Sequence, residues 1–371
     1  MIWKRRSGGS DRSELLIDCL ARPARLGELA PEQWDRLIPQ AREARLLATL
    51  EALLAEQGGQ GRAPGAARDH LRGAGLAAQR RADALEWELS RLVTELPGGL
   101  AAPPLLLKGA AYLAAGLPHA RTRHCADIDL LVARTDLERV ERMLFWAGWQ
   151  PAGLDAYDER YYREWMHQLP PLQHRRRGST LDLHHNILPA TARRPPDPRL
   201  LLDRAVATPG LPGLTVPAPA HLAIHCAVHL LADTEWDKAV RDFHDLDRIL
   251  RHYGAHEGDA FWQELVGEAV RLRCERPVDH AVRHVQARFG TPVPPAVAAA
   301  LARRRPAAPV AGLMVRAVDG ASRPCAGGEQ PRRTRAWRAL LFVRAHWLRM
   351  PPLLLLRHVI HKARVARAEG P

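Results

Sequence analysis

The chain has 371 residues, of which 46% are hydrophobic and 26% are charged, a balance typical of a globular protein with two or three structural units. It has no apolar run of the roughly 20 residues that a bilayer span needs. No apolar stretch follows the basic first residues, so neither a transmembrane segment nor a secretory signal is predicted. Five scattered cysteines without a CxxC pair argue against a disulfide framework or a structural zinc site and favour a cytoplasmic location.

The net charge of +13 is unevenly distributed along the chain. Residues 301–371 hold 15 Lys and Arg against three acids, so the first 300 residues are close to neutral. Only four of the 54 basic residues are lysine, and one of them, Lys108, lies in an apolar segment. The charge therefore indicates a basic tail rather than a nucleic-acid-binding body.

The first part of the chain is expected to be helical. Residues 10–56 place apolar side chains three and four positions apart, which is the spacing of a helix face. The sequence GGQGRAPG predicts a loop, and a second helical pattern runs from about residue 66 to residue 96. We therefore expect an N-terminal helical region over residues 1–97.

The pattern changes to alternating strands and helices over residues 98–190. Leu105–Leu107 reads as a strand that turns through Lys-Gly into a helix, and residues 128–132 read as a second strand. An amphipathic helix follows over 134–149, and residues 179–187 alternate like a third strand. The predicted fold class is α+β, with a small mixed sheet of β-α-β-α-β order flanked by N- and C-terminal helical regions.

The remainder of the chain is expected to be helical and, at its end, basic. A Pro- and Gly-rich linker, ATPGLPGLTVPAP, precedes a helical domain over residues 215–290. Residues 291–371 form a basic tail with two basic apolar segments, which include Trp337, Phe342 and Trp347. Such a tail suits an anionic membrane surface, RNA or DNA phosphates, or packing as a helical cap with solvated charges.

Three carboxylates in the α/β region suggest a metal site. Asp127 and Asp129 stand two apart at the start of a strand, so their side chains are expected on one face. Two close like charges need a counter-ion, and hard oxygen ligands suit Mg²⁺ or Mn²⁺. Asp182, on the third predicted strand, is placed to complete the set.

The strand-to-helix turn suggests a phosphate site beside these carboxylates. Gly109 lets the chain turn so that free backbone N–H groups of the helix end face a phosphate. Lys108 adds a positive charge, and Arg123 lies four residues before Asp127, within reach of the same group. The conjunction of this turn with the three carboxylates predicts a metal-dependent nucleotide site.

Three stretches of the sequence resemble a known family. The stretches LLLKGAAYL, RTRHCADIDLLV and LDLHH are similar to the bacterial uncharacterised nucleotidyltransferases of the polymerase-β-like superfamily. The resemblance implies a metal-binding pair at Asp127 and Asp129, a third carboxylate at Asp182, and a nucleotide-binding turn at Lys108, Gly109 and Ala110. It also matches Arg123 to the arginine of the family signature. His184 stands close to Asp182 in the same stretch of sequence. Ala110 departs from the superfamily, which usually has Ser or Gly there, so a phosphate-binding hydroxyl is missing.

Several residues of the later helical region are candidates for the wall of the same cleft. His221, His225 and His229 recur every four residues, and a packed or surface role is the first expectation for all three. The resemblance extends to His225 and Asp245, which makes His225, His229 and Asp245 candidates for the cleft. Asp247 is expected on a solvated helix face.

The sequence thus predicts an enzyme that moves a nucleoside monophosphate from a nucleoside triphosphate such as ATP to an acceptor hydroxyl. The acceptor is a small molecule, a protein or an RNA. Two alternatives remain: a non-catalytic binding protein that keeps the fold, and a toxin-type nucleotidyltransferase that modifies tRNA.

Overall fold

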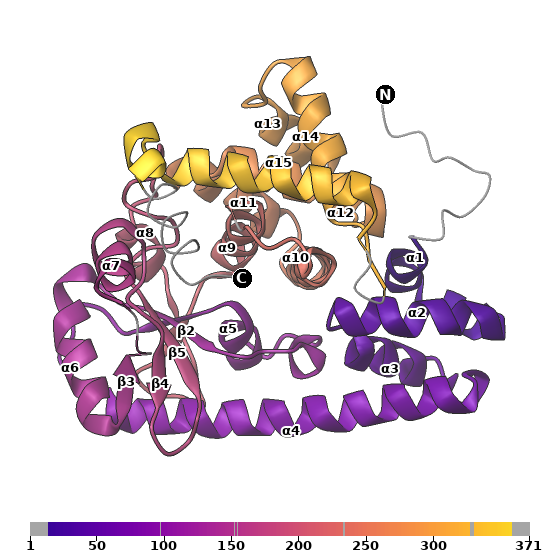
Figure 1. Cartoon of the computed structure of the whole chain (residues 1–371), viewed down its shortest axis with the longest axis horizontal. Coiled ribbons are helices and arrows are strands. Elements are labelled where there is room, and N and C mark those ends of the chain that lie inside the picture. Colours follow the sequence, from indigo (N-terminus) through magenta and orange to yellow (C-terminus); the bar gives the residue numbers. More distant parts are fainter. Residues whose placement is uncertain are drawn as a thin grey trace, which may run out of the picture.

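The computed structural model describes residues 14–357 except 97, 152, 154, 233 and 327–329. Residues 1–13 and 358–371, with the end of the second basic apolar segment, lie outside the described residues. The centre of the described chain is a seven-stranded sheet in the order β3-β4-β5-β2-β1-β7-β6. Strand β2 (Ile128–Leu131) pairs in parallel with β5 (Thr180–His184) and antiparallel with β1 (Leu105–Leu107). The sheet is therefore mixed, as predicted (Figure 1).

The predicted β-α-β-α-β order is not confirmed, because additional elements come between the second helix and the third predicted strand. Helix α5 (Lys108–Ala114) follows β1, and α6 (Leu137–Ala147) follows β2, ending at Gly148 with φ +106°. Before β5 the chain adds β3 (Trp149–Pro151), α7 (Ala156–Arg160), a π-helical turn (Tyr161–Trp165) and β4 (Leu172–His174). Strands β3 and β4 have three residues each and, unlike β1, do not form an apolar run, so the sequence did not reveal them.

The segment predicted to be a linker belongs to the sheet. After α8 (Arg199–Leu202) come β6 (Val206–Ala207) and β7 (Thr215–Val216), and β7 pairs in parallel with β1. The backbone N–H and the hydroxyl of Thr215 both donate to the carbonyl of Pro104, at 3.0 and 3.1 Å. The Pro and Gly residues between β6 and β7 form the connection of a short antiparallel pair.

The N-terminal region is helical, as expected. It contains α1 (Leu15–Ala21), α2 (Pro31–Glu43), α3 (Leu47–Glu56) and the long α4 (Gly65–Glu95), with short 3-10 turns at Pro23–Glu28 and Gln60–Arg62. Helix α4 runs along the lower side of the molecule in Figure 1, from α2 and α3 to the sheet. There Arg177 binds Glu88 and Glu95 of α4 at 2.7 and 2.8 Å, which attaches the helix to the β4–β5 turn.

The C-terminal half is built around one buried helix. Helix α9 (Pro219–Ala232) packs against α10 (Ala239–His256), α11 (Asp259–Arg271), α12 (Glu275–Phe289) and α5. A continuous hydrophobic core joins the N-terminal helices, the sheet and these helices. The helical region therefore packs directly on the α/β unit, and a site can form between them.

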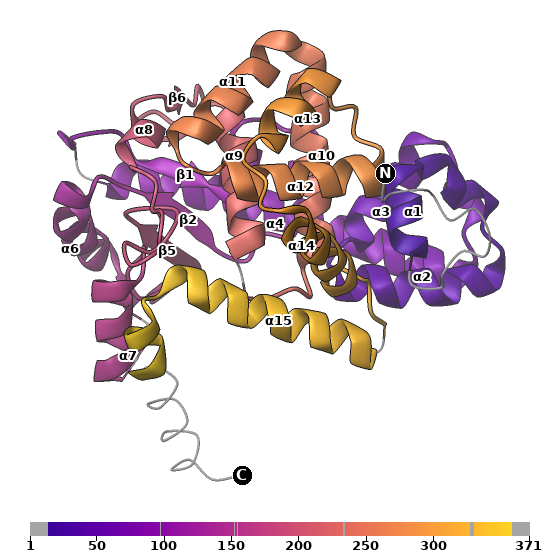
Figure 2. The ribbon, with the colours of Figure 1, turned by 90° about the horizontal axis from the view of Figure 1, so that it is seen from above.

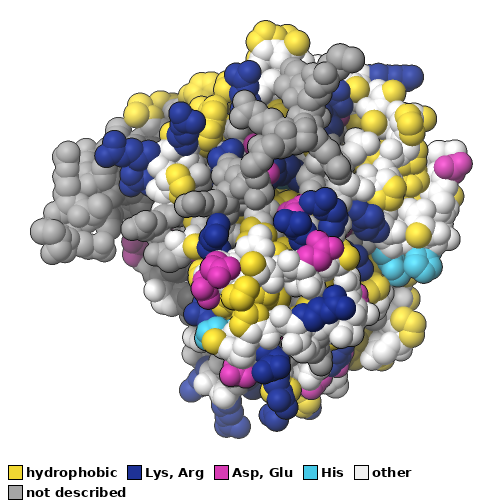
Figure 3. Space-filling view, turned by 90° about the vertical axis from the view of Figure 1, so that its right-hand side faces the viewer, with side chains coloured by type: hydrophobic (Ala, Val, Ile, Leu, Met, Phe, Trp, Pro, Cys, Tyr) yellow, Lys and Arg dark blue, Asp and Glu magenta, His cyan; other side chains and the backbone are white. Residues whose placement is uncertain are grey.

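The basic tail contains α13 (Pro295–Ala302), α14 (Ala308–Ala321) and α15 (Arg332–Arg349), followed by a helical segment over 352–357. Helix α15 lies across the outside of the molecule, against α14 and α9 (Figures 1 and 2). It buries Thr334, Leu341 and Ala345 but leaves Phe342 and Trp347 about half exposed. At the end of the molecule that carries α1–α3, basic side chains are dispersed among acidic and apolar ones (Figure 3). Among the described helices, none combines the length and apolar character of a membrane span.

Candidate metal and nucleotide site

A cavity of about 380 Å³ opens between the sheet, α9, α10 and the end of α15. Nine of the residues predicted from the sequence line it: Lys108, Gly109, Arg123, Asp127, Asp129, Asp182, His225, His229 and Asp245. His184 contacts Asp129, and Ala110 is a buried residue of α5. A cavity of this volume is within the range that binds one small-molecule ligand.

Within the part of the chain that the structure describes, Asp129, Asp182 and His184 form a group of side chains that could hold a metal ion. Asp129 and Asp182 are direct partners in the parallel β2–β5 pair, so their side chains share a face. One ligand atom from each of the three residues lies within 4.8 Å of the others. Two carboxylates and an imidazole suit a divalent ion such as Mn²⁺, and the carboxylates alone suit Mg²⁺. The donor set therefore fits the predicted cofactor.

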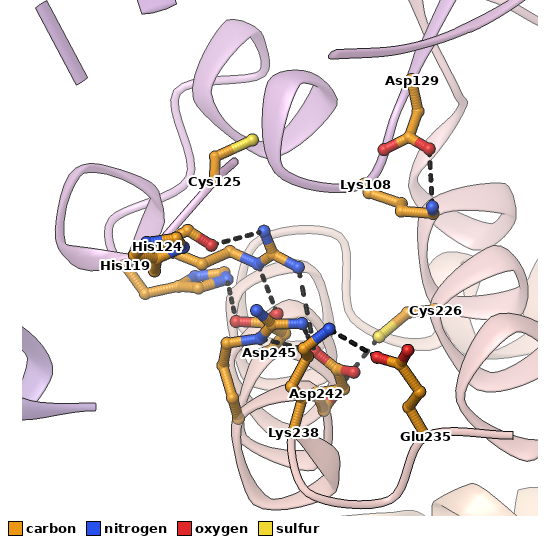
Figure 4. Close-up of polar contacts among 12 residues, drawn as sticks. Lys108, His119, His124, Cys125, Asp129, Cys226, Glu235, Lys238, Asp242 and Asp245 are labelled. Atoms are coloured by element: carbon orange, nitrogen blue, oxygen red, sulfur yellow. Dashed lines mark hydrogen bonds and ion pairs between the residues drawn. The ribbon is translucent and has the colours of Figure 1, made fainter. Parts of the chain in front are cut away.

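Lys108 is the cation nearest to these carboxylates. Leu107 is opposite Asp129 in the β1–β2 pair, so the next residue is brought beside it. The Nζ of Lys108 lies 2.6 Å from Oδ1 of Asp129, and the same oxygen is 3.0 Å from Nε2 of His184 (Figure 4). Burial opposes both charges, but Lys108 and His184 together hold the pKa of Asp129 well below its usual value. Asp129, Asp127 and Asp182 in turn raise the pKa of Lys108.

Asp127 is at the rim of this group. It lies in the bend just before β2, where it is partly exposed and lines the cavity. Its charge contributes to the raised pKa of both Lys108 and Asp182. All three predicted carboxylates are thus electrostatically coupled to one ammonium group.

Asp182 is a carboxyl group with a raised pKa. Burial and the neighbouring charge of Asp129 raise its pKa to about 6. Its Oδ2 accepts a hydrogen bond of 3.2 Å from Nε2 of Gln168, a residue that the sequence analysis did not single out. Without a metal, this carboxylate is more readily protonated than an ordinary aspartate.

The raised pKa of Asp182 predicts a pH-dependent stability in metal-free protein. The folded protein binds this proton more tightly than the unfolded chain, so the stabilisation is complete below pH ~4 and is lost as the pH rises through about 6. We expect Asp182→Asn to gain about 2 kcal/mol in free energy of unfolding relative to wild type between pH 4 and 7. Chemical denaturation in EDTA measures this difference. A constant difference across this range would show that Asp182 titrates normally, and the exposed Asp69→Asn is the control.

Glycine is required at position 109 because neighbouring side chains leave no room for a Cβ atom. The positive φ of +47° at the turn belongs to Lys108, which is a strained conformation for a residue with a side chain. A Cβ on Gly109 would meet Nη1 of Arg123 at 2.5 Å and Sγ of Cys125 at 2.7 Å. The turn predicted at Gly109 is therefore made by the backbone of Lys108.

Gly109→Ala is therefore expected to destabilise the protein by about 1–3 kcal/mol through overpacking. Gly73→Ala in α4 is the matched control, because a Cβ there meets nothing within 4 Å. The control is expected to stabilise by roughly 0.5–1 kcal/mol, as alanine does within a helix. Thermal or chemical denaturation of both variants checks the opposite signs, and a neutral Gly109→Ala would contradict the close approach.

Arg123 is buried in an ion-pair network with α10. Its Nε binds Oδ2 of Asp245 at 2.6 Å, and its Nη2 is 3.8 Å from Asp242. Asp242 and Asp245 face the His119–Cys125 segment from α10 (Figure 4). Burial, reinforced by the charge of Arg123, lowers the pKa of His119 to about 3, so this neighbour is neutral. The network joins the α/β unit to the helical region, and it places Arg123 at the cavity with its guanidinium already engaged.

The three histidines of α9 have different surroundings. His225 and His229 line the cavity, whereas Nε2 of His221 lies 2.8 Å from Glu268 of α11, away from it. Burial, followed by the charge of Lys108, lowers the pKa of His225 to about 3. His225 is therefore a neutral side chain in the wall of the cavity.

The prediction for Asp247 was wrong. This residue is 3% exposed, and its carboxylate accepts hydrogen bonds from Thr291 at 2.6 Å and Arg251 at 2.7 Å. A helical spacing of charges does not reveal a polar partner that lies on another segment.

The comparisons with known proteins bear on this geometry. Residues 30–290, more than two thirds of the chain, match the model of the uncharacterised nucleotidyltransferase family, so the chain belongs to this family. The predicted resemblance is confirmed at that level. No curated protein and no solved structure matches the chain significantly.

Proposed function

We propose that the chain is a divalent-metal-dependent nucleotidyltransferase of the polymerase-β-like superfamily. It transfers a nucleoside monophosphate from a nucleoside triphosphate to an acceptor hydroxyl. The observation that carries this proposal is the meeting of Asp127, Asp129 and Asp182 around Lys108 in one cavity. Family membership and the volume of the cavity support it.

The carboxylates supply the metal ligands in this proposal. Asp129 and Asp182 hold Mg²⁺ or Mn²⁺, with Asp127 at the open side and His184 behind Asp129. When bound, such an ion supplies positive charge at the phosphate oxygens. Lys108 then turns from Asp129 to the triphosphate, since its carboxylate partner is shared with the ion.

The transfer itself is an in-line displacement at the α-phosphorus. The acceptor oxygen forms a bond to this phosphorus, and the bond from phosphorus to the bridging oxygen of the pyrophosphate breaks. The proton of the acceptor hydroxyl passes to Asp182. Asp182 lines the same cavity, and its carboxylate can accept this proton.

The acceptor is a small molecule, a protein or an RNA, and the basic tail is a candidate contact. The outer face of α15 presents the half-exposed Phe342 and Trp347 together with the exposed Val343. Exposed arginines of the same helix, such as Arg333, accompany them. This combination suits an anionic membrane or RNA, and such a contact stays a prediction.

The test is incubation with each α-labelled nucleoside triphosphate, Mg²⁺ or Mn²⁺, and cell extract. We expect a labelled acceptor with wild type and none with Asp127→Ala/Asp129→Ala. Digestion of the product with protease or ribonuclease then assigns the acceptor class. Labelling that persists in the double variant would overturn the proposal. Absence of both labelling and calorimetric nucleotide binding would identify a non-catalytic binding protein, and growth arrest abolished by Asp127→Ala would identify a toxin.

A further inference from the structure

The end of α15 reaches the cavity from outside the family-matched part of the chain. The match covers residues 30–290, whereas α15 spans Arg332–Arg349. Its last residue, Arg349, lines the same cavity as Lys108, Asp127 and Asp182. The wall of the site is therefore composed partly of a segment that the family model does not include.

The position of this helix end is fixed by backbone contacts. The hydroxyl of Thr191 donates to the carbonyl of Arg349 at 2.7 Å, and the N–H of Arg193 donates to the carbonyl of Leu348 at 3.2 Å. Earlier in the helix, Nη1 of Arg344 donates to the carbonyl of Leu231 in the last turn of α9. Figure 2 shows this end of α15 beside α7. These contacts fix the backbone at Arg349, so the point from which its side chain extends is fixed as well.

The charge of Arg349 acts on the part of the cavity that holds the carboxylates. Burial lowers the pKa of His229, and the positive charges of Lys108 and Arg349 add to the effect. The same two charges act on His167, whose ring centroid is 5.3 Å from that of His184. Arg349 is therefore close to the residues that surround Asp129.

Apart from Lys108, the other basic side chains at the cavity belong to α10 and its start or to the network around Arg123. Arg123 binds Asp245, Arg241 binds Asp242 and Lys238 binds Glu235. Arg45 is near His124, since it contributes to the lowered pKa of that residue, on the side of the Arg123 network. A triphosphate needs cationic partners near the metal ligands, and a guanidinium matches phosphate with two parallel hydrogen bonds.

We propose that Arg349, at the end of α15, binds the phosphates of the nucleoside triphosphate together with Lys108. This inference rests on the proposed nucleotidyltransferase function and assigns to the C-terminal helix a direct part in substrate binding. Arg349→Ala is expected to weaken nucleotide binding by about 10- to 100-fold, the range for loss of a charged hydrogen-bonding partner. Arg349→Lys restores part of the loss, because it keeps the charge but not the fork geometry.

The experiment is calorimetric titration of the full chain with α,β-methylene analogues of the four nucleoside triphosphates in Mn²⁺. The control is Arg335→Ala, on the exposed outer face of the same helix, which is expected to bind like wild type. Arg349→Gln is a second variant with a polar side chain of similar length, and it leaves the backbone carbonyl that Thr191 binds. Melting temperatures verify that each variant is folded.

The outcomes separate the two proposals. If wild type binds an analogue and Arg349→Gln binds it at least ten-fold more weakly while Arg335→Ala does not, the assignment is supported. If both variants bind like wild type, Arg349 is not a phosphate ligand, although the nucleotide site stands. If wild type binds no analogue, the proposed function fails and the assignment fails with it.

Discussion

Replacing Asp129 by asparagine is expected to reduce nucleotidyl transfer by at least about 10³-fold, because the carboxylate is both a metal ligand and the anion beside Lys108. The amide keeps the volume of the side chain but cannot neutralise a divalent ion. The initial rate of α-label transfer measures the effect. The exposed Asp69→Asn on α4 is the matched control and should transfer at the wild-type rate.

A stability measurement makes the Asp129 result interpretable. The variant leaves the largely buried ammonium of Lys108 without its partner, so the free energy of unfolding should fall by about 3 kcal/mol. A folded Asp129→Asn protein that still transfers label at more than a tenth of the wild-type rate would show that Asp129 is not a metal ligand.

Replacing Lys108 by methionine is expected to change metal binding and nucleotide binding in opposite directions. Asp129 is 1% exposed and loses its nearest cation, so metal-free protein should be destabilised by about 3 kcal/mol. Mn²⁺ then takes over the neutralisation and should stabilise the variant more than it stabilises wild type. Nucleotide affinity should fall about ten-fold, since a charge that reaches the phosphates is removed.

Denaturation with and without Mn²⁺, followed by nucleotide calorimetry, checks these signs for Lys108. Lys238→Met is the matched control for stability, because its partner Glu235 is 60% exposed and the pair should contribute less than about 1 kcal/mol. An equal or smaller Mn²⁺ effect in Lys108→Met than in wild type would show that Lys108 does not compete with a metal for Asp129.

Strand periodicity made it possible to predict which side chains share a face at the centre of the site, although the pairing that joins the strands is not local. A strand, a Lys-Gly turn and a helix were readable around residue 108, and the parallel pairing of β2 with β5 brings Asp182 beside Asp129. The alternation of side chains along a strand then places both carboxylates on one face. These relations depend on strand periodicity, which the sequence displays.

The surroundings of the site could not be predicted from the sequence, because they depend on contacts between segments that are far apart in the chain. Arg123 was expected at a phosphate, but its partner Asp245 is 122 residues further along the chain and occupies its guanidinium. Strand β7 has two residues within a Pro- and Gly-rich segment, too few for a pattern. The position of Arg349 follows from backbone contacts of residues 191 and 193 with the end of α15, which no local motif encodes.

The most direct test of nucleotidyl transfer is a comparison of α-labelled with γ-labelled nucleoside triphosphate in the same extract, with wild type and Mn²⁺. If the carboxylates around Lys108 direct attack to the α-phosphorus, the α-label enters the acceptor and the γ-label leaves in pyrophosphate. Transfer of the γ-label to the acceptor would contradict nucleotidyl transfer and would show instead that the site transfers a terminal phosphoryl group.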